Sequence, residues 1–443
     1  MTGPAPRRTL AACVVVLAAA APAPAVAGAA PPARFMAGSA PAVAGPTPTP
    51  PARSVATVVP CPTTPAPDVS RPPRPAPPVV GPDERAVGGP ALATAGLVVP
   101  PGVPAPPALT ATSWLVADLE TGAVLGGCGP HEPSTPASVQ KLLLAATLLP
   151  RLDPRQVVTV TAADLDIEPG SSAVGLVEGG RYPVELLWLG LLLQSGNDAA
   201  NTLARLGGGG QGAAGGVRAM NEQARRLGAY QTRAVTPSGL DGPGQFTSAY
   251  DLALIARVCF ADPTFRRYAL TERTQVPAQG RLAKGFQIQN ENQLVYRYPG
   301  ALGGKTGFTD LARHTYVGAA ERDGRRLVVA LLNAEPRPLR GWQQGAALLD
   351  WGFALPRDAT VGRLVEPGEP LPGATPAAVA SVSAPAVVPA GRDAGTPWSD
   401  LARPMLLAGA VPLLGVALVV WRVRRRRGSA GAARDGGRSP QPR

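Results

Sequence analysis

The chain is poor in lysine and histidine. Of its 443 residues only three are lysines, Lys141, Lys284 and Lys305, whereas every other cationic side chain is arginine. An ammonium group can lose its proton when it is desolvated and a guanidinium cannot, so a lysine kept in an arginine-biased chain is a candidate for chemistry. The only histidines are His131 and His314, and a Ser-His-Asp triad would have to recruit one of them.

Cysteine is also scarce. The four cysteines are Cys13, Cys61, Cys128 and Cys259, and no cluster of cysteines and histidines has metal-ligand spacing. Cys13 falls in a segment that resembles a signal peptide, which leaves an odd number. Export permits one disulfide. We prefer Cys61 with Cys128, because Cys61 otherwise lies in an exposed linker, but the pairing among the three remains open.

Acidic residues are fewer than basic ones, 30 against 42, which gives a formal charge of +12. This charge is unevenly distributed along the chain. The residues after Trp421 carry a net charge of +7, and Arg7 and Arg8 add two positive charges near the other end. About +3 is left for everything between them. That remainder gives no electrostatic footprint for DNA or RNA, so the sequence predicts that nucleic acid is not a partner.

Both ends of the sequence are typical of a membrane protein. Residues 1–27 combine an arginine pair, an apolar run and small residues at a cleavage site, which predicts a signal peptide. Residues 404–421 are almost entirely apolar and an arginine-rich segment, 422–443, follows at once. This pattern predicts a transmembrane helix with a cytoplasmic tail. We therefore expect a single-pass protein of the cell membrane whose main domain is extracellular.

Proline- and alanine-rich segments frame one region with clear periodicity. We interpret residues 28–107 and 358–403 as linkers and residues 108–357 as the folded domain. Within that domain the patterns predict strands at 113–117, 123–125, 315–320 and 326–332, and helices from 136, at 184–193 and at 341–351. Two strands, a helical middle, further strands and a last helix are typical of an α+β fold.

Ser138 and Lys141 are three residues apart in the first turn of a predicted helix and so share one face. A serine hydroxyl needs a base to become a nucleophile. Lysine can be that base if burial and a nearby positive charge lower its pKa. Taken alone, the pair is explained better as a surface serine and a surface lysine.

Two further motifs follow. Ser195-Gly196-Asn197 comes directly after an apolar helix, where a helix cap would be the simpler interpretation. Lys305-Thr306-Gly307-Phe308 offers an ammonium and a hydroxyl to a carboxylate, beside a glycine that lets a ligand backbone come close. A phosphate-binding P-loop needs four residues between its first glycine and Gly-Lys-Thr. Residues 300–304 enclose three, which excludes that alternative.

The three motifs occur in the order Ser-x-x-Lys, Ser-x-Asn, Lys-Thr-Gly, separated by 57 and 110 residues. A closely related set marks penicillin-binding proteins and β-lactamases. With Pro237-Ser238-Gly239-Leu240 and Asn290-Glu291-Asn292, residues of about 110 to 355 resemble the D-alanyl-D-alanine carboxypeptidases among the low-molecular-mass penicillin-binding proteins.

The resemblance implies a β-lactamase/transpeptidase-like α+β fold, in which helices flank a five-stranded antiparallel sheet and a helical subdomain completes the cleft. It also implies that Ser138 attacks the penultimate D-alanine, that Lys141 is the base and that Ser195 relays the proton. Backbone N–H groups of Ser138 and Phe308 are the expected oxyanion donors. The implied substrate-binding residues are Asn197, Lys305, Thr306, Gly307 and Phe308.

The expected partners are peptidoglycan stem peptides ending in D-Ala-D-Ala, with β-lactams as inhibitors, and no metal or organic cofactor is implied. A β-lactamase and a non-catalytic peptidoglycan-binding module with the same fold remain alternatives. The sequence does not separate carboxypeptidase from endopeptidase action. Arg340 is left out of the predicted site, because its register against the last helix is off by one.

Overall fold

The computed structural model describes residues 58–68 and 70–371. Several expected segments lie outside these ranges: the signal peptide (1–27), part of each linker (28–57 and 372–403), the transmembrane helix (404–421) and the tail (422–443). Within the described ranges, no helix is both long enough and apolar enough to cross a membrane.

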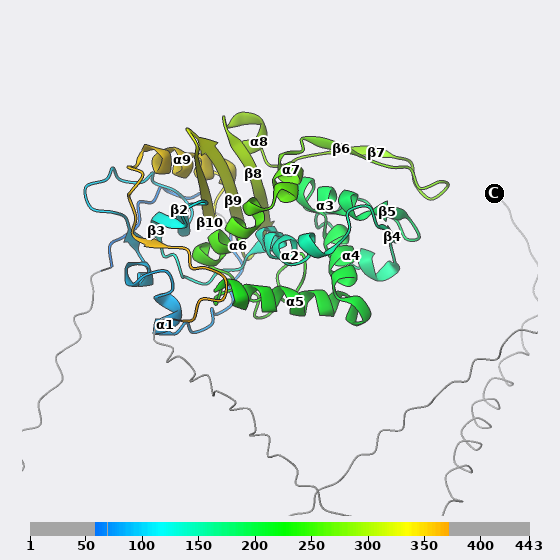
Figure 1. Ribbon diagram of the computed structural model, residues 1–443, viewed down its shortest axis with the longest axis horizontal. Coiled ribbons are helices and arrows are strands. Elements are labelled where there is room, and N and C mark those ends of the chain that lie inside the picture. Colours follow the sequence, from blue (N-terminus) through cyan, green and yellow to red (C-terminus); the bar gives the residue numbers. More distant parts are fainter. Residues whose placement is uncertain (1–57, 69, 372–443) are drawn as a thin grey trace, which may run out of the picture. The chain divides into compact units, whose positions relative to one another are not determined.

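An antiparallel sheet lies at the centre of the fold (Figure 1). Its five long strands run in the order β3-β2-β10-β9-β8, which confirms the predicted five-stranded antiparallel sheet. Their bounds are Ser113–Asp118 (β2), Ala123–Cys128 (β3), Ala301–Thr309 (β8), Arg313–Arg322 (β9) and Arg325–Ala334 (β10). At the far end from β3, strand β8 pairs only with β9 in the described sheet, so one of its edges is open.

Alternate residues of β10 face opposite sides of the sheet, as the geometry of a strand requires. Val329 and Leu331 belong to the hydrophobic cluster under α9 (Gly341–Ala354). Val328 and Ala330 belong to a larger cluster on the other face, which α6 (Ala249–Ala261) covers. The core is therefore split by the sheet into two layers, and the predicted closing helix forms one of them.

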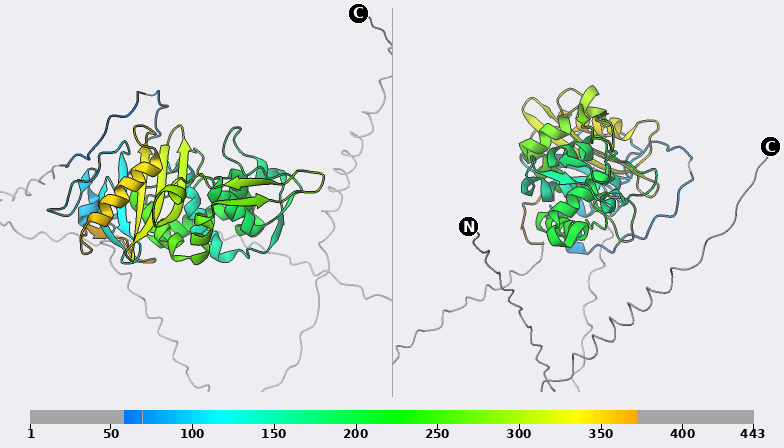
Figure 2. Two further views of the ribbon diagram at one scale, coloured as in Figure 1. Left: turned by 90° about the horizontal axis from the view of Figure 1, so that it is seen from above. Right: turned by 90° about the vertical axis from the view of Figure 1, so that its right-hand side faces the viewer.

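Helices α3 (Val184–Leu193), α4 (Asn197–Gly207) and α5 (Gly212–Leu227) gather beside the sheet and form the predicted helical subdomain (Figures 1 and 2). Helix α2 (Lys141–Leu148) has all eight residues buried, because it packs on both α6 and the subdomain helix α5. The other helices are α1 (Pro82–Arg85), α7 (Pro263–Leu270) and α8 (Leu294–Arg297), of which α8 contacts β8 and α9. Two hairpins complete the fold, formed by β4 (Val157–Thr159) with β5 (Arg181–Pro183) and β6 (Arg273–Val276) with β7 (Phe286–Gln289).

The domain is longer at its beginning than the sequence predicts. Residues 58–107 were expected to belong to a linker, but Leu92 is fully buried and β1 (Leu97–Val98) pairs with the outer edge of β3. A disulfide joins Cys61 to Cys128 of β3, the preferred pair. The prediction is wrong for this part because a few apolar residues pack against a distant strand, and such contacts leave no periodic pattern in the sequence.

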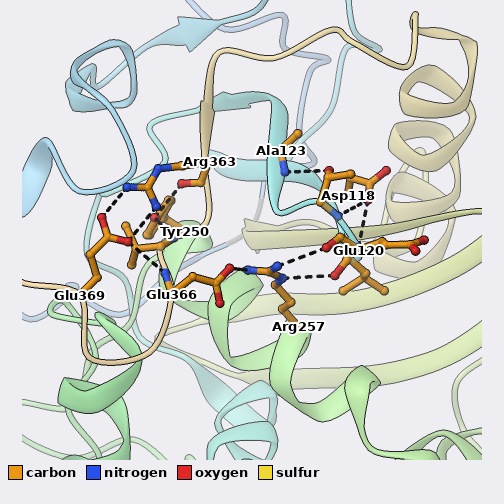
Figure 3. Close-up of polar contacts among 11 residues, drawn as sticks. Asp118, Glu120, Ala123, Tyr250, Arg257, Arg363, Glu366 and Glu369 are labelled. Atoms are coloured by element: carbon orange, nitrogen blue, oxygen red, sulfur yellow. Dashed lines mark hydrogen bonds and ion pairs between the residues drawn. The ribbon is translucent and has the colours of Figure 1, made fainter.

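The domain also continues past its expected end at residue 357. Strand β11 (Gly362–Arg363) pairs with β3, and Leu364 and Val365 enter the core. We call residues 361–371 the C-terminal strap. Figure 3 shows how polar contacts hold it: the Tyr250 hydroxyl donates to the Arg363 carbonyl at 2.9 Å, and Arg257 forms an ion pair with Glu366 at 2.8 Å.

Candidate active site

Ser138 lies in a 3-10 turn, Ala137–Gln140, that leads directly into α2. The helix predicted from Pro136 therefore begins as a tighter turn. Ala137 has a φ of +49°, a left-handed conformation that costs a non-glycine residue about 1–3 kcal/mol. Thr315 of β9 donates its hydroxyl to the Pro136 carbonyl at 2.8 Å and so fixes the turn against the sheet.

Lys141 is completely buried behind Ser138. Its Nζ lies 2.8 Å from Ser138 Oγ, 2.7 Å from Asn197 Oδ1 and 2.8 Å from the carbonyl oxygen of Ser238. Burial holds the pKa of Lys141 well below its usual range, and the nearby Lys305 ammonium lowers it further, whereas the Asp198 carboxylate opposes the shift. None of its three hydrogen-bond acceptors is a carboxylate, so the neutral amine is favoured.

A neutral amine fits these three contacts. Its two N–H groups donate to the Asn197 amide oxygen and the Ser238 carbonyl, which leaves the nitrogen lone pair for the Ser138 hydroxyl proton. A lone pair directed at the Ser138 hydroxyl in this way is the arrangement that general-base catalysis would require.

The second motif forms the turn between α3 and α4. Ser195 adopts a φ of +59° and Asn197 is the first residue of α4. Ser195 is 4% exposed, and its Oγ has no hydrogen-bond partner within the described ranges. The turn is fixed by the buried Asp198 carboxylate, which accepts hydrogen bonds from the backbone N–H groups of Val174, Gly175, Leu176 and Ala199.

The third motif lies on the open-edged strand β8. Lys305 is 2% exposed and donates to the Thr306 carbonyl at 2.8 Å. Burial lowers the pKa of Lys305 to about 8, although the Glu291 carboxylate opposes the shift. Phe308 is half exposed, with its ring 4.8 Å from that of His314.

Gly307 lets β8 pass close to Ser138. A Cβ at this position would come within 2.9 Å of the Ser138 backbone nitrogen and 2.3 Å of Thr315 Oγ1. Any larger residue would push β8 away from Ser138. The glycine of the motif is therefore required by the approach of two backbones.

These residues surround one cleft of about 370 Å³. Six of the eight predicted site residues line it: Ser138, Ser195, Asn197, Thr306, Gly307 and Phe308. Lys141 and Lys305 lie behind its wall and contact lining residues. The other lining residues are Gly170, Ser171, Ser172, Leu240, Glu291 and His314. His314 is one of them, whereas Arg340 is not.

Gln245, which none of the sequence motifs includes, organises the loop behind Lys141. Its side-chain oxygen accepts from the backbone N–H groups of Val235 and Thr236 and from Gln140 Nε2, at 2.9–3.0 Å. The loop so held carries Ser238, whose carbonyl oxygen faces Lys141. The contact with Lys141 uses a backbone carbonyl, which every residue has, so the sequence does not reveal it.

Within the described ranges, no group of three or more His, Cys, Asp or Glu side chains is placed to hold a metal ion. His131 is buried away from the cleft, where its ring nitrogens contact Gln231 and the Val87 carbonyl. Burial lowers the pKa of His131. Its contacts are those of a core histidine.

Residues 102–336 match the Peptidase S11 family, described as D-alanyl-D-alanine carboxypeptidase. A similar protein is D-alanyl-D-alanine carboxypeptidase DacB2 of Mycobacterium tuberculosis, 45% identical over 260 residues, which cover 57% of this chain and 86% of that one. D-alanyl-D-alanine carboxypeptidase DacD of Salmonella typhimurium is 34% identical, and the match covers 56% of this chain and 64% of that one.

Solved structures are similar as well. A D-alanyl-D-alanine carboxypeptidase from Mycobacterium tuberculosis H37Rv matches with a TM-score of 0.57 at 43% identity, covering 60% of this chain and all of that one. The Streptomyces K15 DD-transpeptidase matches with a TM-score of 0.54 at 26% identity, covering 57% of this chain and all of that one. Each match leaves about two fifths of this chain or more without a counterpart.

Proposed function

The chain belongs to the D-alanyl-D-alanine carboxypeptidase family, and on that basis we propose that it removes the terminal D-alanine from peptidoglycan stem peptides through an acyl-enzyme on Ser138. The observation that carries the assignment of the nucleophile is the 2.8 Å contact between Ser138 Oγ and a fully buried amine, Lys141 Nζ. β-Lactams act as inhibitors because they acylate the same serine.

In the acylation step, Lys141 takes the proton of the Ser138 hydroxyl as Oγ bonds to the carbonyl carbon of the penultimate D-alanine. The bond from that carbon to the terminal D-alanine nitrogen then breaks. Ser195 passes a proton to the leaving amine, a role that its buried hydroxyl without a partner within the described ranges supports. Water then hydrolyses the ester and frees Ser138.

The substrate lies along the open edge of β8 in this proposal, as an added strand. Lys305 and Thr306 bind its terminal carboxylate, Asn197 contacts its backbone amide, and Gly307 and Phe308 form the wall beside the scissile bond. Lys305 also keeps the site electropositive, which helps to hold Lys141 neutral.

Labelling with a fluorescent penicillin tests the assignment. We expect covalent labelling of the 58–371 domain and release of D-alanine from a D-Ala-D-Ala peptide, with both lost in Ser138→Ala and kept in Ser70→Ala, an exposed serine outside the cleft lining. Labelling that survives in Ser138→Ala would falsify the nucleophile. Rapid penicillin turnover without peptide cleavage would favour a β-lactamase, and neither reaction would favour a binding module.

The same proposal includes the location of the enzyme. Residues 1–27 export the chain and residues 404–421 anchor it, with the catalytic domain outside and residues 422–443 inside. The disulfide between Cys61 and Cys128 supports an oxidising compartment. External protease should release the domain from membranes by cutting between about 372 and 403 while the tail stays protected. A protein recovered from the wall fraction without its tail would contradict the anchor.

A further inference from the structure

A polar hollow of about 430 Å³ lies at the base of the β6–β7 hairpin and shares no lining residue with the catalytic cleft. Two guanidinium groups, three side-chain amides and one phenol form its lining: Arg273, Arg297, Gln289, Asn290, Gln293 and Tyr296. Among the described residues, no carboxylate and no aliphatic side chain lines it, whereas the catalytic cleft includes Glu291. This lining suits a polar anion and not an apolar group.

The two arginines of the hollow are available to a ligand. Both are exposed, and within the described ranges neither Arg273 nor Arg297 forms an ion pair. Arg297 Nε donates to Gln293 Oε1 at 3.1 Å, which is a neutral acceptor. A guanidinium stays charged and offers paired N–H groups that match the geometry of a carboxylate. The hollow therefore holds two positive charges that no carboxylate of the described chain balances.

Two other lining residues are fixed by hydrogen bonds to the backbone. Asn290 is 3% exposed, and its Nδ2 donates to the carbonyl oxygens of Ala269 and Thr271, both at 3.1 Å. The Tyr296 hydroxyl donates to the Glu272 carbonyl at 2.9 Å, while 40% of the residue remains exposed. A ligand would therefore not have to order these two side chains, which lowers the entropic cost of binding.

Strand β8 relates the position of the hollow to that of the cleft. In the proposed mode, the terminal carboxylate of the substrate lies at Lys305 and Thr306. Nearer the amino end of β8, a Cβ at Gly303 would lie 2.8 Å from the Ala269 carbonyl oxygen, which is the oxygen that binds Asn290. Helix α8, which forms another part of the lining, contacts β8 as well (Figure 1). The hollow therefore lies beyond the carboxylate end of the substrate, on the side where the leaving group departs.

This location restricts the kind of ligand. A stem peptide that ends in D-Ala-D-Ala stops at its terminal carboxylate and does not extend to the hollow. A ligand at this place must therefore belong to a second strand. That strand is either the neighbouring stem peptide of the same polymer or the leaving strand of a cross-linked substrate, and in both cases the group that the arginines would recognise is a free carboxylate.

We propose that this hollow, which we call the second-strand site, binds a carboxylate of a second stem peptide through Arg273 and Arg297. The inference rests on the proposed function and adds a substrate preference to it. Stem peptides within the polymer should be better substrates than an isolated peptide with the same ending, because only the polymer supplies a second strand.

Three substrates test the site in the full chain: a short acetylated peptide ending in D-Ala-D-Ala, uncross-linked peptidoglycan with the same ending, and a cross-linked dimer of stem peptides. The ratio of kcat/KM for peptidoglycan to kcat/KM for the short peptide should fall about fivefold in Arg273→Gln combined with Arg297→Gln, because two exposed ion pairs each add a small attraction. This fall should shrink as ionic strength rises. A similar fall for the dimer would identify the leaving strand as the ligand, and a fall for peptidoglycan alone would identify the neighbouring strand.

The matched control is Arg225→Gln combined with Arg226→Gln, which removes two exposed positive charges outside both linings and should keep the wild-type ratios. An equal fall in the control would reveal a general attraction to an anionic polymer and would overturn the second-strand site. Unchanged ratios for both larger substrates in the Arg273 and Arg297 variant would overturn it as well, while release of D-alanine from the short peptide would leave the proposed function intact. If the wild type does not cleave the short peptide, the proposed function fails, and the second-strand site fails with it.

Discussion

Buried charged groups have different partners in the cleft and in the rest of the domain, which we call the framework. Arg325 and Asp118, whose side chains are 5% and 9% exposed, form an ion pair at 3.3 Å. Lys141 and Lys305 are buried at least as deeply, yet their hydrogen-bond acceptors are hydroxyl, amide and carbonyl oxygens. In the framework the two charges balance each other, whereas in the cleft burial lowers the pKa of each lysine.

The difference separates stability from reactivity. A buried ion pair keeps both groups charged and fixes the strands that carry them. A buried amine that donates only to neutral acceptors is destabilised in its charged form, which lowers its pKa and leaves the neutral amine available as a base. Substitutions in the cleft should therefore change the reaction rate, whereas substitutions in the framework pair should change the free energy of unfolding. The effects expected from three experiments follow, from the largest to the smallest.

Lys141→Arg gives the largest expected effect. The guanidinium stays protonated and cannot accept the Ser138 proton, so acylation by penicillin should slow by about a thousandfold. Lys284→Arg, at the exposed lysine outside the motifs, is the matched control and should label like the wild type. Equal, mild losses in both variants would count against Lys141 as the base.

Asp118→Asn breaks the framework pair instead. An unpaired Arg325 in the buried site should lower the free energy of unfolding by about 3 kcal/mol, whereas kcat/KM of the folded enzyme should remain within about twofold of the wild type. Asp350→Asn breaks the exposed pair with Arg322 and should cost less than about 1 kcal/mol. Chemical denaturation measures both. Similar losses of unfolding free energy in the two variants would mean that the buried pair matters no more for stability than the exposed one.

The pH dependence gives the smallest effect and separates the two lysines. Lys305 binds a carboxylate only when it is charged, so kcat/KM should fall as pH rises through its pKa of about 8. The decline should approach about tenfold per pH unit. Lys305→Arg should remove this alkaline limb, because arginine stays protonated. The acid limb, where Lys141 becomes protonated, should persist in the variant. An unchanged alkaline limb would exclude Lys305 as its origin.

The main residues of the cleft could be predicted from the sequence because the three motifs are defined by side chains. The spacing of Ser138 and Lys141 places both on one face of a helical turn. Gly307 was expected to admit a ligand backbone, and the structure adds that it lets β8 approach Ser138. The sheet was predictable for a similar reason, since alternation along β10 reports the two layers that it separates.

What the sequence did not predict depends on the backbone or on isolated contacts. The carbonyl of Ser238 and the amides that bind Asp198 belong to groups that every residue carries. Leu92 and Val365, in the supposed linkers, fill the core singly. A single buried residue produces no periodic hydrophobic pattern in the sequence. The prediction from composition therefore began the domain too late and ended it too early.

Strands β1 and β11 have a mechanical consequence. Both ends of the described chain are attached to the outer edge of β3, by these short strands and by the bond between Cys61 and Cys128. Tension on a tether at either end would be applied to this edge, with β2, β10 and β9 between it and β8. The strand that carries Lys305 is thereby separated from the points of loading by three strands, so tension enters the sheet at the edge opposite to the one proposed to bind a peptide.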